Sequence, residues 1–86
     1  MKIDEQLSKQ LRETSAPGRE LAVIIELEPG ADVAMLRSAG VKVNRVYENI
    51  SAVAATITAD LVPRVAALPQ VKRIELDTEA RVLGPR

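Results

Sequence analysis

The sequence contains no cysteine, histidine, tryptophan or phenylalanine among its 86 residues. The lack of cysteine and histidine excludes disulfides, metal sites built on these ligands, cysteine nucleophiles and Ser-His triads. Tyr47 is the one aromatic residue, so the chain has no set of rings on which nucleic-acid bases could stack. We find no catalytic motif and predict a protein that is not an enzyme and uses no cofactor.

An excess of positive or negative charge is also lacking. Twelve Lys and Arg residues balance twelve Asp and Glu residues, and both signs are spread evenly along the chain. No basic patch is present to neutralise phosphates, so we expect no nucleic-acid partner. The hydrophobic fraction of 47% is too high for a disordered chain.

Long apolar runs are missing as well, and none approaches the roughly 18 residues of a membrane span. The first residues do not resemble a signal peptide, because charges and a glutamine interrupt any apolar stretch. We therefore expect a soluble protein without a membrane partner. As written, the chain would be cytoplasmic, and a secreted form would need a leader.

The first segment has the pattern of an amphipathic helix. Ile3, Leu7 and Leu11 recur every four residues, and a run of Thr, Ser, Pro and Gly follows. This predicts a helix over residues 1–13 and a linker over 14–19. Two interpretations are open, because isolated helices of this length are marginal in water. The segment is either a solvated tail or a clip that docks on the domain or on a second copy.

The remainder alternates between strand and helix patterns. Strands are predicted over 21–28, 41–48, 52–58 and 71–77. The first helix between strands should run from Val33 to Ala39, with Asp32 as its N-cap and Gly40 as its stop. The second helix should carry Leu61, Val62, Val65 and Leu68, with Thr58 or Asp60 as its cap and Pro63 in its first turn.

The element order is βαββαβ, which predicts an α+β fold, a ferredoxin-like sandwich of a four-stranded antiparallel sheet with two helices on one face. The N-terminal helix would extend it. We divide the chain into residues 1–19, a domain over 20–77 and an extended tail over 78–86. The core would be aliphatic only, so the domain should be marginally stable alone.

A sheet covered on one side leaves its other face open. Alternation places Leu21, Val23, Ile25 and Leu27 of the first strand together, and it places Val53, Ala55 and Ile57 of the third strand together. The second strand would direct Val41, Val43 and Tyr47 one way, with Arg45 fitting that set poorly. The open face would present small or apolar residues: Ile24, Ala52, Ala54, Thr56, and Ile74 or its neighbours. This is either an ordinary partly apolar surface or a docking platform.

Glu75 and Asp77 lie two apart on the last predicted strand and therefore point to the same side. Such a pair can bind a metal, act as acid and base, or cap the helix N-termini of a partner. No further ligands lie nearby in the sequence, so we predict no metal site. Two solvated edge charges are the simplest interpretation.

The tail after Asp77 combines the small Ala80 with the apolar pair Val82 and Leu83, and Gly84 with the following Pro disfavours a helix. It is either a disordered terminus or a peptide that pairs as a strand in the groove of another protein.

Several runs together resemble the subtilisin propeptide-like inhibitor family, which comprises pro-regions of subtilisin-like serine proteases and free-standing relatives. The resemblance covers about residues 21–83. It rests on a strand followed by Pro-Gly, an Ala-rich strand, a Leu-Pro-x-Val element and an Ile-Glu-x-Asp element, found in the following runs: Ala22 to Gly30, Tyr47, Ile50 to Ile57 and Leu68 to Asp77.

The resemblance implies a ferredoxin-like fold whose open sheet face packs on two surface helices of the protease. It implies that Glu75 and Asp77 meet the N-termini of those helices. It also implies that the tail enters the substrate cleft like a cleaved product. Leu83 would fill the primary specificity pocket, and the preceding subsites would hold Val82, Arg81 and Ala80. Alternatively, Arg86 is the last bound residue.

Two hypotheses of different classes follow. The first is an inhibitor of a subtilisin-like serine protease, a folding chaperone of it, or both, which acts by occupying the cleft. The second is a ferredoxin-like module for oligomerisation or ligand sensing. In the second, self-association would use the sheet face or the N-terminal helix.

Overall fold

The computed structural model describes residues 3–13, 18–47 and 49–77. Within them the chain forms α1 (Glu5–Glu13), β1 (Glu20–Leu27), α2 (Ala34–Ser38), β2 (Lys42–Tyr47), β3 (Ala52–Thr58), a 3-10 helix η1 (Ala59–Leu61), α3 (Val62–Ala66) and β4 (Val71–Leu76). The third strand begins and ends as predicted, and the other three strands agree with prediction to within one residue at each end.

The four strands form one antiparallel sheet in the order β2-β3-β1-β4. β3 therefore lies between β1 and β2, and β1 lies between β3 and β4, so each helical connection joins two parallel strands that are not neighbours. The α+β fold with a four-stranded antiparallel sheet is confirmed. The arrangement is compatible with the ferredoxin-like fold expected from the element order.

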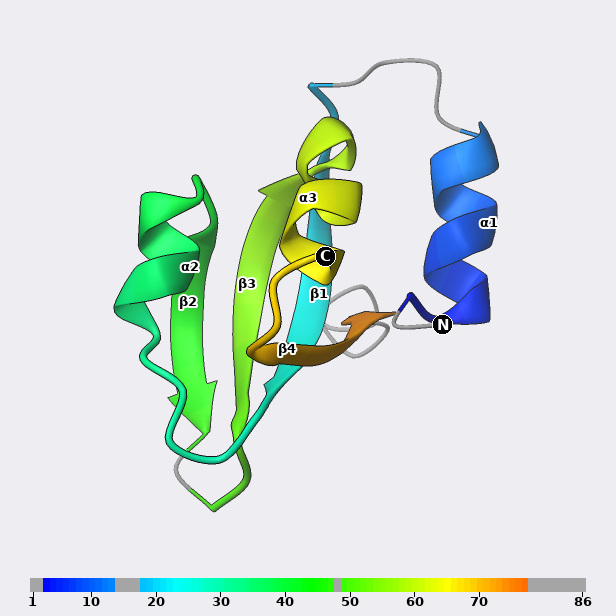
Figure 1. The fold of residues 1–86 in the computed structure, drawn as a ribbon. Helices are drawn as coiled ribbons and strands as arrows, with labels where there is room; N and C mark the ends of the chain where they lie inside the picture. The colour runs from blue at the N-terminus through cyan, green and yellow to red at the C-terminus, as the bar shows by residue number, and fades with distance from the viewer. Residues whose placement is uncertain (1–2, 14–17, 48, 78–86) are drawn as a thin grey trace, which may run out of the picture.

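All the helices contribute to a single core on one face of the sheet (Figure 1). Leu7 of α1, Leu36 of α2 and Val65 of α3 are fully buried there. They meet alternate residues of the strands, which were predicted to share a face: Leu21, Val23, Ile25, Leu27, Val53, Ala55 and Ile57. Ile74 belongs to this core as well, so the open face receives its neighbours and not Ile74 itself.

α1 is a docked element and not a solvated tail. Its Leu7 enters the core, and Ile3 and Leu11 pack against it, as the predicted stripe requires. Ile3 also forms a parallel bridge with Ile74, and the backbone N–H of Asp4 donates to the carbonyl of Ile74 at 2.9 Å. The N-terminal segment therefore lies along the outer side of β4.

Each of the two crossover helices is only five residues long. Before α2, the Asp32 carboxylate accepts a hydrogen bond from the Ala34 N–H at 2.9 Å, which is the capping role predicted for it. Gly40 follows with φ of 97°, and a side chain there would also meet Leu61 at 3.3 Å. The left-handed turn at Gly40 explains why the helix stops.

The predicted cap of the second crossover helix is wrong in its detail. Thr58 precedes η1 without a side-chain capping bond, and Asp60 lies inside η1. The chain enters α3 through this tighter 3-10 turn, and Pro63 occupies the first turn of α3, where it replaces no helical donor.

The expectation that Tyr47 faces the same way as Val41 and Val43 is also wrong. Register between β2 and β3 shifts between Val43 and Arg45. Asn44 is therefore an extra residue, and a bulge of this kind reverses the side-chain alternation beyond it. Tyr47 consequently lies opposite Ala52, on the face away from the core.

We predict that α1 is part of the cooperative folding unit. Replacing the fully buried Leu7 with alanine should lower the free energy of unfolding by about 2–5 kcal/mol, because it leaves a cavity in the core. The matched control is Lys9→Ala on the exposed side of the same helix. This substitution should change the free energy of unfolding by about 0.5 kcal/mol or less. Chemical denaturation measures both, and equal effects would contradict the docking of α1.

Candidate protein-docking face

The face of the sheet opposite the helices is built from residues that alternate with the core residues. Strand pairing arranges these residues in rows that cross all four strands. One row runs from Arg45 through Ala54 and Ile24 to Glu75. The next row along the strands runs from Lys42 through Thr56 and Ala22 towards Asp77, whose N–H donates to the Ala22 carbonyl at 2.9 Å. We call this surface the open face.

The predicted docking residues lie together at its centre. Ala54 is directly opposite Ile24, and Thr56 is opposite Ala22. Ile24, Ala54 and Thr56 are partly exposed, whereas Ala52 is only 3% exposed and offers almost no surface. The accessible centre is therefore small and uncharged, and a flat element can approach its backbone closely.

The predicted carboxylate pair lies on the β4 side of the open face. Glu75 pairs with Ile24 across the strands, and its carboxylate lies 3.6 Å from the Arg73 guanidinium. Asp77 follows directly after β4, on the same side of the sheet as Glu75 and next to Ala22. The two carboxylates therefore border the open face.

Arg73 joins the open face to the N-terminal segment. Its Nη2 lies 3.1 Å from Oδ1 of Asp4, in addition to its contact with Glu75. The other oxygen of Asp4 accepts the Gln6 N–H at 3.1 Å and so begins α1. The docking of α1 therefore holds Arg73 next to Glu75. Sequence reasoning gave Arg73 no part in the site.

Arg45 and Tyr47 on β2 are also residues of the open face that the sequence reasoning missed. The Arg45 guanidinium lies 5.2 Å from the centre of the Tyr47 ring, within the range of a cation–π interaction. The sequence signal that would have placed them is a break in the alternation of apolar and polar residues along this strand. The apolar residues of this strand fall at 41, 43 and 46, which indicates a bulge between the second and third.

The bulge residue itself bonds across the open face. Asn44 Nδ2 donates to Thr56 Oγ1 at 2.9 Å. This bond holds the irregular part of β2 against β3, so that the direction of the Arg45 side chain is defined.

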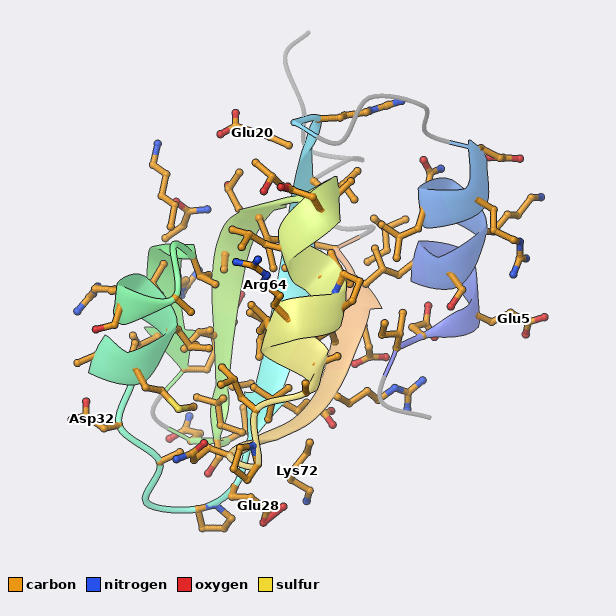
Figure 2. All side chains as sticks on the ribbon, turned by 45° about the horizontal axis from the view of Figure 1, so that its top comes forward. Glu5, Glu20, Glu28, Asp32, Arg64 and Lys72 are labelled. Carbon is orange, nitrogen blue, oxygen red and sulfur yellow. The ribbon has the colours of Figure 1, made fainter. Side chains whose placement is uncertain are left out.

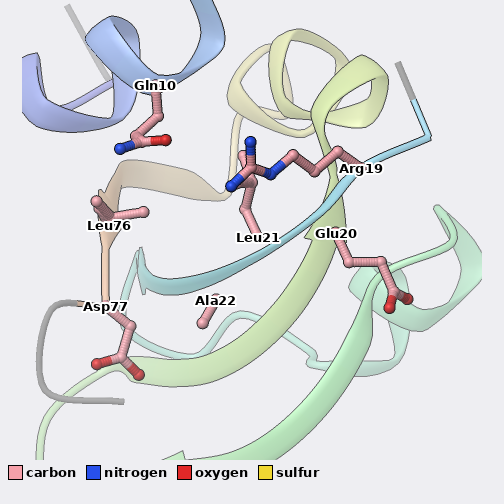
Figure 3. A pocket seen from close by; sticks show the side chains of 7 residues that line it. All are labelled: Gln10, Arg19, Glu20, Leu21, Ala22, Leu76 and Asp77. Carbon is pink, nitrogen blue, oxygen red and sulfur yellow. The ribbon is translucent and has the colours of Figure 1, made fainter. Parts of the chain in front are cut away.

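A hollow of about 210 Å³ lies where α1 meets the ends of β1 and β4. Figure 3 shows the seven residues that line it: Gln10, Arg19, Glu20, Leu21, Ala22, Leu76 and Asp77. The carboxylates of Glu20 and Asp77 lie apart in Figure 3, with Ala22 between them, and so do not form an acid–base pair. The hollow is open and mixed in polarity, which does not resemble a preformed pocket for a small substrate.

Within residues 3–13, 18–47 and 49–77, no group of three or more His, Cys, Asp or Glu side chains is placed to hold a metal ion. In the same ranges, no helix has the length and apolar character needed to cross a membrane. The predicted cleft-binding residues Ala80, Arg81, Val82 and Leu83 lie outside the described residues. No model of a known protein family matches the chain, and no curated protein matches it.

We predict that the same substitution at two adjacent isoleucines of β1 changes the free energy of unfolding by very different amounts. Ile25 is fully buried, so Ile25→Thr should cost about 2 kcal/mol or more of unfolding free energy, because it removes core contacts and buries a hydroxyl. Ile24→Thr on the open face should change it by about 1 kcal/mol or less. Urea denaturation of both variants tests the assignment, and a larger loss at Ile24 would refute it.

Proposed function

We propose that this protein inhibits a subtilisin-like serine protease and assists its folding. The observation that carries the proposal is the open face, where a small uncharged centre is bordered by Glu75 and Asp77. The resemblance of the sequence to the subtilisin propeptide-like inhibitors supports it, and the α+β fold is compatible with that family's fold.

Docking would use helices of the protease laid across the open face. A helix N-terminus carries a partial positive charge and unpaired N–H groups, so a carboxylate placed there is stabilising. Glu75 and Asp77 would supply these carboxylates, and the small Ala54 would let the helices approach the sheet. Arg73 lies 3.6 Å from Glu75 and would limit how far that side chain strays from the face.

Inhibition would come from the tail. Residues 80–83 would pair as a strand in the substrate cleft, with Leu83 in the primary specificity pocket. Occupancy of the cleft requires no chemistry by the inhibitor. Assistance in folding follows by linkage, because a protein that binds only the folded protease stabilises that state.

The first test separates the tail from the face. A broad-specificity subtilisin is titrated with the full chain and with a chain ending at Glu79, while hydrolysis of a chromogenic peptide is followed over time. We expect stoichiometric or slow-binding inhibition by the full chain and none by the shortened one. Absence of inhibition with rapid digestion of the full chain would refute the proposed function.

The second test concerns the face. Glu75→Gln should raise the inhibition constant roughly two- to fivefold, the range expected when one carboxylate at a helix N-terminus is lost. Glu13→Gln, an exposed glutamate on α1, is the matched control and should leave the constant unchanged. Equal constants for the two variants would show that Glu75 does not meet a partner helix.

A further inference from the structure

The two sides of the open face carry opposite charge. On the β2 side it presents the cations Lys42 and Arg45. Among the described residues, the β1 and β4 side carries four carboxylates beside Arg73, and Lys72 lies near one of them, Glu26, at the end of the face; the other three are Glu20, Glu75 and Asp77. The residues between them are small or apolar. A surface divided in this way is complementary to itself, provided that one copy is turned so that its basic side covers the acidic side of the other.

We propose that the open face is an interface between two copies of this chain, which pack face to face about a two-fold axis parallel to the strands. Such an axis reverses the order of the strands across the interface. β2 of one copy then lies over β4 of the other, and β3 lies over β1. This dimer does not depend on the proposed function, although both partners would compete for the same face.

The rows of the sheet determine which side chains meet. Because the axis runs along the strands, each row faces its own counterpart in the second copy. Arg45 and Glu75 are the two ends of one row, so Arg45 meets Glu75 of the second copy. Lys42 and Asp77 end the next row and meet in the same way. Each contact occurs twice, as two-fold symmetry requires.

The other face-to-face arrangement is unfavourable. A two-fold axis in the interface plane but perpendicular to the strands would place β2 over β2 and β4 over β4. Lys42 and Arg45 would then face the cations of the second copy, and the carboxylates would face carboxylates. Like charges brought together at an interface oppose association, so charge selects the first arrangement.

The centre of the face suits the packing of two sheets. With the axis along the strands, Ala54 faces Ile24 of the second copy, and Thr56 faces Ala22 of the second copy. A larger side chain therefore meets a smaller one at each contact. Packed sheets lie about 10 Å apart, a spacing that interdigitating side chains of this size can fill.

The size of the face predicts a weak dimer. Four strands with about six residues each cover roughly 20 Å by 20 Å. Two such faces bury about 1,000 Å² in total, at the lower end of specific interfaces. We therefore expect a dissociation constant of roughly 10–500 μM, which falls as the ionic strength is lowered.

The decisive experiment mixes two charge-reversed variants. Sedimentation equilibrium of the full chain should show a monomer–dimer equilibrium. Arg45→Glu alone and Glu75→Arg alone should each raise the dissociation constant about tenfold or more, because each places like charges together twice. In an equimolar mixture of the two variants both contacts regain opposite charges, so a heterodimer should form with a dissociation constant within about threefold of the original.

Exposed charges on the helical side supply the matched controls. Arg37→Glu on α2 and Glu13→Arg on α1 should leave the equilibrium unchanged, alone and mixed. Ala54→Arg at the centre of the face should abolish the dimer without reversing a charge, and denaturation curves establish that each variant is folded. A monomer at all concentrations up to about 1 mM, or a dimer that survives Ala54→Arg, overturns the proposal. If the mixed variants fail to recover the dimer, the proposed axis is wrong.

Discussion

The structure depends on burial of aliphatic side chains on one face only. Without phenylalanine or tryptophan, each core residue buries little area, so the core draws four aliphatic residues of β1 onto the same side: Leu21, Val23, Ile25 and Leu27. α2 and α3 have five residues each, so each is about 7.5 Å long, much shorter than the eight-residue β1. They cannot cover the sheet alone, so α1 packs beside β4 (Figure 2) and its Leu7 completes the core.

The same constraint links the N-terminus to the open face. α1 must be held against β4, and Asp4 does this through its N–H to Ile74 and its carboxylate to Arg73 and the Gln6 N–H. Arg73 in turn lies beside Glu75. Asp4, which begins α1 on the core side of the sheet, therefore orders Arg73 on the open face. The outer edge of β4 is occupied in the process, which reduces its tendency to pair with other strands.

Period-two alternation was sufficient to predict β3 at its observed bounds and to sort β1 into a core face and an open face. It failed on β2, where the extra Asn44 shifts the phase and brings Arg45 and Tyr47 to the open face. Sequence spacing brought Glu75 and Asp77 together, but it could not reveal Arg73 beside Asp4, because that contact joins residues far apart in the chain. The basic side of the open face was missed for the same reason, because it can be recognised only once the order of the strands in the sheet is known.

The position of Tyr47 has a practical consequence. It is the one aromatic residue of the chain, and it lies on the open face beside Arg45, away from the core. Intrinsic fluorescence and near-ultraviolet circular dichroism of this protein therefore arise from the docking surface, and the packed core is spectroscopically silent. Occupation of the open face can be followed on the unmodified protein through its own tyrosine emission, without an attached dye. A change in that signal reports what covers the sheet before it reports how well the interior is folded.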